Sequence, residues 1–320
     1  MNKLSKIYIA GHKGLVGSAL IRQLIARGYT NIIARTHTEL DLLDKDKVSA
    51  FFKKEKPEYV ILAAAKVGGI YANNTYPAEF IYQNLEIQNN VIHNAYLNNV
   101  KQLLFLGSSC IYPRDCPQPI KEEYLLTGPL EATNRPYALA KIAGIEMIWS
   151  YNRQYQTRYL AVMPTNLYGP EDSFDLQNSH VLPALIRKMH EAKIINAKEV
   201  VVWGTGKPMR EFLINDDMAD ACIHLLESAN LEDINIFNET SPPLVNIGSG
   251  TDISIEDLAN QIKIAIGFAG NIVFDSAKPD GTMKKLLDVT RLKLLGWKYK
   301  VDLKTGIEMT YKQYLRSLGQ

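Results

Sequence analysis

The chain has 320 residues, of which 46% are hydrophobic and 22% charged, so it is long enough to bury a substantial core in one large or two modest domains. Its 36 basic and 34 acidic residues leave a formal charge of +2, and their even spread excludes a polybasic nucleic-acid arm or a membrane-binding patch. No apolar run reaches the roughly 18 residues of a membrane span, and no signal-peptide pattern precedes the first strand.

Three cysteines, Cys110, Cys116 and Cys222, cannot all pair with one another. They also lack metal-ligand spacing such as Cys-x-x-Cys, so we expect neither a disulfide framework nor a metal site. Free thiols fit a reducing compartment, and a cytoplasmic location is expected.

The first half of the chain alternates short apolar runs with longer amphipathic ones. We expect strands at residues 6–10, 31–35, 59–65, 102–109 and 159–164, and helices at 15–28, at 44–57, from near Pro77, and at 136–155. Strands that alternate with helices predict a parallel sheet covered on both faces. The expected fold class is therefore α/β, with a doubly wound parallel sheet of the Rossmann type.

The regular pattern weakens after residue 168. We expect helices at 179–192, 216–229, 253–267 and from Leu303, and strands at 200–204 and 244–250. No linker or repeat separates this part from the first, so we interpret it as a smaller α+β domain that packs closely on the sheet. The predicted domains are 1–172 and 173–320, with later segments free to return to the first, and a ligand cleft between them.

A glycine turn follows the first strand and opens the first helix with the spacing G-x-x-G-x-x-G. Such a turn adopts positive φ, lets a pyrophosphate approach the backbone, and offers it the N–H groups of a helix start. Its place in a βαβ series favours dinucleotide binding over a purely structural turn. The residues predicted to bind the dinucleotide here are Gly11, His12, Lys13, Gly14, Leu15, Val16 and Gly17.

The end of the second strand indicates which dinucleotide is bound. An NAD-dependent protein usually offers an acidic side chain there to the ribose 2′-hydroxyl, but this strand ends in Arg35, with His37 shortly after it. Together with Lys13 these cations suit a 2′-phosphate, which predicts NADP(H) as the cofactor.

An alternative for the same segment stays open. Arg35 would then be a solvated charge at the end of a strand, and Glu39 and Asp41 are near enough in the sequence to serve NAD. Asp41 and Leu42 could instead flank the adenine.

Tyr137 and Lys141 lie four residues apart, on one face of the helix that starts at Pro136. An unperturbed tyrosine has a pKa of about 10, and a nearby ammonium or cationic nicotinamide stabilises its phenolate. We expect Lys141 to lower the pKa of Tyr137 and to hold the nicotinamide ribose. Alternatively, Tyr-x-x-x-Lys is simply the surface of an amphipathic helix.

Two serines end the fourth predicted strand. A hydride that moves to a carbonyl leaves negative charge on its oxygen, so a proton donor must lie within hydrogen-bond reach. We expect Tyr137 to be this donor, and Ser108 or Ser109 to donate a second hydrogen bond, because strand ends in such sheets face the ligand crevice.

Eight long segments resemble the extended short-chain dehydrogenase/reductase family, and within it the enzymes that act on GDP-linked 4-keto-6-deoxy sugars. They cover nearly the whole chain: GHKGLVGSAL, LAAAKVGGIYANNTYPAEFIYQN, LFLGSSCIYP, PYALAKIAGIE, VMPTNLYGP, NSHVLPALIRK, VVWGTGKPMREFL and KPDGTMKKLLDVTRL. The resemblance implies conversion of GDP-4-keto-6-deoxy-D-mannose to GDP-L-fucose, by epimerisation at C3 and C5 and NADPH-dependent reduction at C4. It also implies that residues 1–172 hold NADP and that 173–320 mainly hold the GDP-sugar.

From the residues alone, Cys110 could be a small buried hydrophobe, and His180 a capping or core histidine. The resemblance assigns them instead as the base and the acid of the epimerisation, beside Ser108, Tyr137 and Lys141 for the reduction. A thiol of pKa about 8.5 becomes a competent base in positive or polar surroundings, and an imidazole of pKa about 6.5 exchanges protons near neutrality.

The resemblance also extends both binding sites. Beyond the glycine turn, it implies cofactor contacts from Arg35, His37, Asp41, Leu42, Ala64, Leu106, Gly107, Ser108, Lys141, Pro164, Thr165, Asn166, Leu167 and His180. The GDP-sugar would contact Lys188, Trp203, Arg210 and Asp280, since cations suit a pyrophosphate and an aromatic surface suits a base or a sugar face. Lys188 and His37 stand where some members carry arginine, which exchanges bidentate contacts for monodentate ones.

The resemblance implies a homodimer formed through the stretches IYQNLEIQNNVIHNAYL and IAGIEMIWSYNRQY, although their apolar stripes could equally be core. Cys116 and Cys222 match no functional position and are interpreted as a loop and a packing residue. Three other functions stay open: the same chemistry on a 4-keto-3,6-dideoxy sugar, reduction alone or epimerisation alone of a nucleotide sugar, and a non-catalytic nucleotide sensor.

Overall fold

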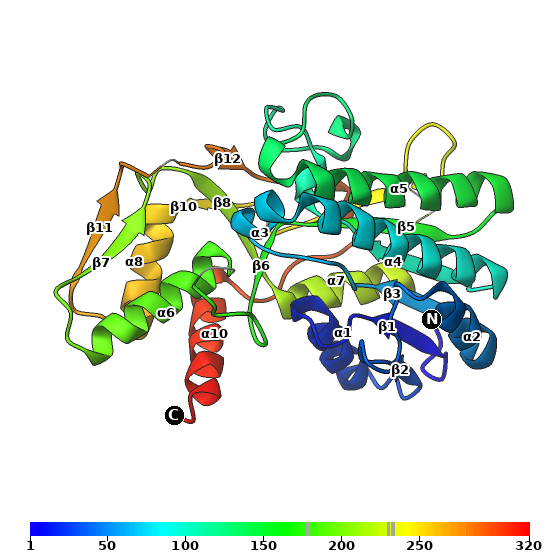
Figure 1. Cartoon of the computed structure of the whole chain (residues 1–320), viewed down its shortest axis with the longest axis horizontal. Coiled ribbons are helices and arrows are strands. Elements are labelled where there is room, and N and C mark those ends of the chain that lie inside the picture. Colours follow the sequence, from blue (N-terminus) through cyan, green and yellow to red (C-terminus); the bar gives the residue numbers. More distant parts are fainter. Residues whose placement is uncertain (177–178, 229–230, 232–233, 279) are drawn as a thin grey trace.

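The computed structural model describes residues 1–176, 179–228, 231, 234–278 and 280–320. Figure 1 shows a sheet with helices on both faces, and beside it a smaller part that contains α6 (Val181–Ile194), α8 (Ile255–Ile266) and α10 (Leu303–Ser317). In the described residues, no helix is both long and apolar enough to cross a membrane.

The main sheet has six strands in the order β2-β1-β3-β4-β5-β9, and every neighbouring pair is parallel. The strands are β1 (Ile7–Ala10), β2 (Ile32–Ala34), β3 (Tyr59–Leu62), β4 (Gln102–Leu106), β5 (Tyr159–Pro164) and β9 (Leu244–Ile247). This confirms the predicted doubly wound parallel sheet. The order reverses at β1, so a crevice at the carboxyl ends of β1 and β3 is the expected ligand site.

The residues of each strand alternate between two cores. Tyr8 and Ala10 face the core shared with α2 (Lys45–Glu55), α4 (Pro77–Leu97) and α5 (Arg135–Tyr155). Ile7 and Ile9 face the core shared with α1 (Leu15–Ala26) and α7 (Asn215–Glu227). Burial on both faces explains why the strands are apolar throughout rather than alternating.

Local signals start and stop the helices as the sequence predicts. The Asp44 side chain caps α2 by accepting a hydrogen bond from the Lys47 backbone N–H at 3.0 Å. Pro77 and Pro136 lie in the first turns of α4 and α5, where a missing N–H costs nothing.

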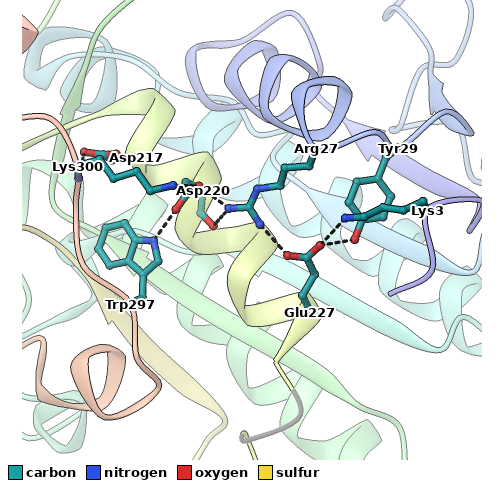
Figure 2. Close-up of polar contacts among 8 residues, drawn as sticks. All are labelled: Lys3, Arg27, Tyr29, Asp217, Asp220, Glu227, Trp297 and Lys300. Atoms are coloured by element: carbon teal, nitrogen blue, oxygen red, sulfur yellow. Dashed lines mark hydrogen bonds and ion pairs between the residues drawn. The ribbon is translucent and has the colours of Figure 1, made fainter.

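A polar cluster between α1 and α7 ties late parts of the chain to the main sheet (Figure 2). Arg27, which caps the C-terminus of α1, bridges Asp220 and Glu227 of α7. Asp220 also accepts hydrogen bonds from the Trp297 indole at 2.9 Å and the Lys300 ammonium at 2.6 Å. Segments beyond residue 172, including α7 and β9, therefore pack into the layers of the first half, while the boundary at 172 stays a prediction.

The smaller part is built around β8 (Met209–Ile214). This strand pairs with β6 (Asn166–Tyr168), β10 (Asp252–Ser254) and β12 (Lys284–Lys285). A separate parallel pair joins β7 (Glu199–Trp203) to β11 (Asn271–Asp275). Phe212 and Ile214 of β8 contribute to a third core, with residues of α6, α8 and α10.

All predicted helices and strands are present, and the structure contains several further short elements that the sequence did not predict. These are β6, β8, β10, β11, β12, α3 (Ile70–Thr75), α9 (Thr290–Leu294), and the 3-10 turns η1 (Ser109–Ile111), η2 (Glu122–Tyr124) and η3 (Ala132–Asn134). Most span two to six residues, a length at which tertiary pairing outweighs local propensity.

Candidate active site

The glycine turn packs directly against the chain that leaves β3. Gly11 has φ +87°, and a Cβ built there would lie 2.6 Å from the Ala64 backbone nitrogen. A Cβ on Gly17 would overlap the Gly11 carbonyl oxygen. Gly14, the N-cap of α1, makes no side-chain cap, so its first backbone N–H groups are available to an anion. The backbone here forms a cradle that only glycine permits.

Arg35 does not lie free at the end of β2. Its Nη2 pairs with Glu55 Oε1 at 2.9 Å, and its Nη1 donates to the Ala34 carbonyl at 2.8 Å. The His37 side chain is 79% exposed and lies 3.6 Å from Asp41, while Lys13 is also exposed. Arg35 and His37 thus each lie beside a carboxylate near the end of β2, whereas Lys13 is exposed in the glycine turn.

The acidic side chains considered for NAD accept hydrogen bonds from groups in their own turns. Glu39 accepts hydrogen bonds from the backbone and hydroxyl of Thr36, and these bonds lower the pKa of Glu39. Asp41 accepts one from the Leu43 N–H at 3.0 Å. The Leu42 side chain is buried in the core, so only its backbone could flank an adenine.

Lys141 is 3% exposed and reaches the carboxyl end of β4, where its Nζ donates to the Leu106 carbonyl at 2.8 Å. Its ammonium also lies 4.7 Å from the Phe105 ring centre and 5.7 Å from that of Tyr137. Burial lowers the pKa of Lys141 to about 8, against a smaller raising effect of Cys110. A Cβ on the neighbouring Gly107 would overlap the Met163 side chain.

Tyr137 is half-buried, with its ring edge-on to Phe80. Burial raises its pKa strongly, and the neighbouring Cys110 raises it further. In the polypeptide alone the pKa of Tyr137 is thus raised rather than lowered, because burial disfavours the charged phenolate. The phenol stays protonated, as a proton donor must be.

Cys110 is 8% exposed and lies in η1, immediately after β4. Its backbone N–H faces Ser108 Oγ at 3.4 Å, whereas Ser109 is buried in the turn. Burial raises the pKa of the Cys110 thiol, while Lys285, a hydrogen bond from Ser108 and Lys141 oppose this rise. The thiol thus interacts with Ser108 and Lys141, two of the three residues expected to serve the reduction.

His180 is the N-cap of α6, at the open side of the site. Although the residue keeps solvent contact, the surrounding protein desolvates its ring, and this effect together with Lys285 lowers the pKa of His180. Lys285 therefore interacts electrostatically with both Cys110 and His180.

The segment that follows β5 joins the main sheet to the smaller part. Thr165 donates from its backbone to the Ile247 carbonyl at 3.0 Å and from its hydroxyl to the Glu211 carbonyl at 3.1 Å. Asn166 Nδ2 donates to the same Glu211 carbonyl at 2.8 Å. Pro164 ends β5, and Leu167 packs against the α1 and α7 core. The side chains of Thr165 and Asn166 thus hold protein groups, which leaves the backbone to line a nicotinamide.

The residues predicted to bind the GDP-sugar gather around β7 and β8. Trp203 is 68% exposed, and Lys188 Nζ lies 5.7 Å from its ring centre. Asp280 accepts hydrogen bonds from the Thr205 backbone at 2.8 Å and hydroxyl at 2.7 Å. Burial lowers the pKa of Arg210, and Asp280 opposes this. An exposed aromatic face beside the Lys188 side chain suits a nucleotide diphosphate.

Sequence reasoning missed Lys278, Glu211 and Lys285. Lys278 Nζ lies 5.4 Å from the Trp203 ring centre. Glu211 lies in the segment MREFL and Lys285 in the segment TMKKLL, both within stretches that carry the family resemblance. No local pattern marks either residue as part of a site. Within the described residues, no group of three or more acidic, histidine or cysteine side chains could hold a metal ion.

A parallel sheet with a glycine cradle, and a serine, tyrosine and lysine at its carboxyl edge, defines a dinucleotide-dependent enzyme class. Residues 7–238 match the model of the NAD dependent epimerase/dehydratase family, and the chain belongs to this family.

The names of similar proteins indicate a narrower class of enzyme within this family. The chain is 55% identical over 318 residues to GDP-L-fucose synthase 1 of Arabidopsis thaliana, covering 99% of this chain and 95% of that protein. It is 55% identical over 315 residues to GDP-L-fucose synthase of Escherichia coli, covering 98% and 97%. The solved structure of MlghC, a GDP-mannoheptose C4 reductase from Campylobacter jejuni with NADP bound, is 44% identical and superposes with a TM-score of 0.90, covering 98% of this chain and 99% of that chain.

Proposed function

We propose that this chain converts GDP-4-keto-6-deoxy-D-mannose to GDP-L-fucose, by epimerisation at C3 and C5 and reduction at C4 with NADPH. One observation carries the proposal: the buried Cys110 thiol lies within electrostatic reach of Tyr137 and Lys141. A reductase needs the tyrosine and the lysine but has no use for a thiol beside them. The relatives with this name cover the full length of the chain.

The residues present fit NADPH. The cradle of Gly11, Gly14 and Gly17 admits a pyrophosphate at the start of α1. Lys13 is exposed in the glycine turn and His37 is exposed shortly after β2, so both could meet a 2′-phosphate, and Arg35 would join them by exchanging its Glu55 contact. When bound, NADPH supplies the hydride for C4.

In the epimerisation, Cys110 acts as the base and His180 as the acid. The C4 carbonyl acidifies the hydrogens at C3 and C5, so a Cys110 thiolate can remove one as a proton while the electron pair moves onto the C4 oxygen. His180 then delivers a proton to the opposite face of that carbon, and the carbonyl re-forms with inverted configuration. After this step Cys110 carries the proton that it removed, and His180 has lost one. Exchange with solvent returns Cys110 to the thiolate and reprotonates His180.

In the reduction, Tyr137 donates its proton to the C4 oxygen as the carbonyl becomes an alcohol. Burial keeps the phenol protonated until that point. Lys141 stands behind it as a largely protonated ammonium near neutrality, because its pKa of about 8 still lies above neutral pH. Ser108 donates a hydrogen bond to the same oxygen in both reactions, where it stabilises developing negative charge.

The test is NADPH consumption with GDP-4-keto-6-deoxy-D-mannose in deuterated water, with the product analysed by NMR. Deuterium at both C3 and C5 of a fucose product is expected, and Cys110→Ser should lower this incorporation while NADPH binding persists. Demonstrable NADPH binding without its consumption would identify a nucleotide sensor instead. Deuterium at C5 alone with a 3-deoxy substrate would identify a dideoxy-sugar enzyme.

Reduction without epimerisation is a second candidate, because the superposed Campylobacter jejuni structure is described as a C4 reductase. It predicts a C4 alcohol that carries no solvent deuterium at C3 or C5. It also predicts that Cys110→Ser leaves turnover unchanged.

We further propose a cytoplasmic homodimer. The paired helices α4 and α5 lie side by side (Figure 1) and expose Tyr82 (62%), Leu97 (55%) and Tyr155 (41%). Tyr155 stacks on Tyr96 with ring centres 4.2 Å apart, which makes a rigid aromatic surface. All three cysteines are free, as expected in a reducing compartment. Light scattering should give twice the chain mass, and Tyr82→Glu should give the mass of one chain.

A further inference from the structure

Glu211 is a fully buried carboxylate in the middle of the molecule that none of the roles above uses. It follows Arg210 on β8, and its exposed fraction is 0%. Within the described residues its side chain has no ion pair with a basic group. A buried charge of this kind is costly unless its oxygens accept several hydrogen bonds.

The Glu211 side chain receives those bonds from two different segments. Oε1 accepts the Gly250 backbone N–H at 2.7 Å, and Oε2 accepts the Leu287 backbone N–H at 3.0 Å. A Cβ on Gly248 would overlap Oε1, so the backbone after β9 approaches the carboxylate as closely as glycine allows. Burial raises the pKa of Glu211, and the bonds from Leu287 and Gly250 oppose this rise.

Leu287 lies in a short segment, residues 285–288, whose backbone forms hydrogen bonds with Gln118, Ile120 and Glu211. The Leu286 N–H donates to Gln118 Oε1 at 2.8 Å, and its carbonyl accepts the Ile120 N–H at 2.7 Å. The Asp288 N–H donates to the Ile120 carbonyl at 2.8 Å. Glu211 supplies the anchor from the side of β8.

This segment begins with Lys285, the cation that acts on the proposed epimerisation pair. Lys285 pairs in register with Arg210 across β12 and β8. Lys285 opposes the burial that raises the pKa of Cys110 and adds to the burial that lowers the pKa of His180. Burial also lowers the pKa of Lys285 itself, and Cys110 opposes this effect. The position of Lys285 therefore affects how easily the Cys110 thiol ionises and His180 gives up its proton.

We propose that Glu211 is a positioning residue for the epimerisation, because its carboxylate fixes the backbone of residues 285–288 and so holds Lys285 in register with Arg210 on β8. The inference rests on the proposed function, since it concerns the base and acid of that reaction. A carboxylate suits this place because both of its oxygens accept, whereas an amide would turn a donor toward either the Gly250 or the Leu287 N–H.

The test compares Glu211→Gln with a matched control, Asp217→Asn. Asp217 is also a buried carboxylate, 3% exposed, that accepts two backbone N–H bonds, from Lys300 at 3.0 Å and Val301 at 2.9 Å. It lies in the polar cluster of Figure 2, on α7. Both variants should lose similar stability, so a purely structural role predicts the same kinetic result for both.

The readout is the rate at which solvent deuterium enters C3 and C5 of GDP-4-keto-6-deoxy-D-mannose. We expect Glu211→Gln to slow this exchange by roughly 10- to 100-fold, the scale of a misplaced catalytic group, and Asp217→Asn to leave it unchanged. NADPH affinity should hold in both variants, because the substitution leaves the Glu211 backbone carbonyl, which accepts hydrogen bonds from Thr165 and Asn166, unchanged.

Two further variants separate the possible outcomes. Glu211→Gln in a Lys285→Met background should slow exchange no more than Lys285→Met alone. Gln118→Ala loosens the same segment from a partly exposed side and should slow exchange even if Glu211→Gln fails to fold. Equal exchange in the wild type, Glu211→Gln and Gln118→Ala would overturn the proposal, whereas a wild type that exchanges neither position would overturn the proposed function instead.

Discussion

Lys141 offers the sharpest quantitative test, because the fold keeps a charged group where water is excluded. Its Nζ has one carbonyl partner, Leu106 O at 2.8 Å, and two aromatic rings nearby. Burial lowers its pKa to about 8. We predict that Lys141→Met abolishes turnover yet does not destabilise the protein near neutral pH.

The magnitude follows from the two opposing effects. A fall in pKa from 10.5 to about 8 means that burying the ammonium costs roughly 3 kcal/mol, at about 1.4 kcal/mol per tenfold change. Methionine removes this cost but leaves the Leu106 carbonyl without its donor, a loss of about 1–3 kcal/mol. The free energy of unfolding of the variant should therefore equal that of the wild type, or exceed it by up to about 2 kcal/mol.

The difference in stability between Lys141→Met and the wild type also depends on pH. Between the folded pKa and the ordinary lysine value, the unfolded chain binds more protons, so the wild type gains stability as pH rises through that window. Urea unfolding should show the advantage of Lys141→Met near pH 7 disappearing, or reversing, by about pH 10. A difference between the two proteins that does not depend on pH would refute the idea that the lysine is held at a desolvation cost.

Three other changes probe the cradle, the polar cluster and the site's support. Gly17→Ala forces a methyl group into the Gly11 carbonyl and should cost about 1–3 kcal/mol of stability. It should also weaken NADPH binding in a fluorescence titration. An unchanged affinity would contradict the role of the glycine turn in binding the pyrophosphate. Asp220→Asn should cost about 3–5 kcal/mol near neutral pH. Burial alone raises the pKa of Asp220, but bonds from its partners hold that pKa below its usual value, so in urea unfolding this difference should shrink as acid protonates the wild type. Tyr112→Phe leaves Asn246 Oδ1 without the hydroxyl that donates to it at 2.6 Å and should cost about 1–3 kcal/mol by chemical unfolding, whereas a neutral effect would mean that Asn246 finds another donor.

The sequence by itself determined the class of fold and much of the site's inventory. Buried parallel strands must be apolar throughout, and the glycine turn has few solutions, so both are legible as local patterns. The positions of Ser108, Cys110, Tyr137 and Lys141 follow from their places at a strand end and on one helical face. The role of Cys110 came from resemblance, because nothing local separates a reactive thiol from a packed one.

Only the tertiary structure decided what surrounds these residues. Glu211 and Lys285 come from strands far along the chain, and no local pattern encodes the contacts that join Lys285 to Arg210 and Leu287 to Glu211. The pKa of Tyr137 also rises rather than falls in the polypeptide alone, because burial, which depends on the packing of the whole molecule, disfavours the phenolate. Spacing along a chain specifies which groups can share a face, but desolvation and long-range contacts decide which of them carry charge.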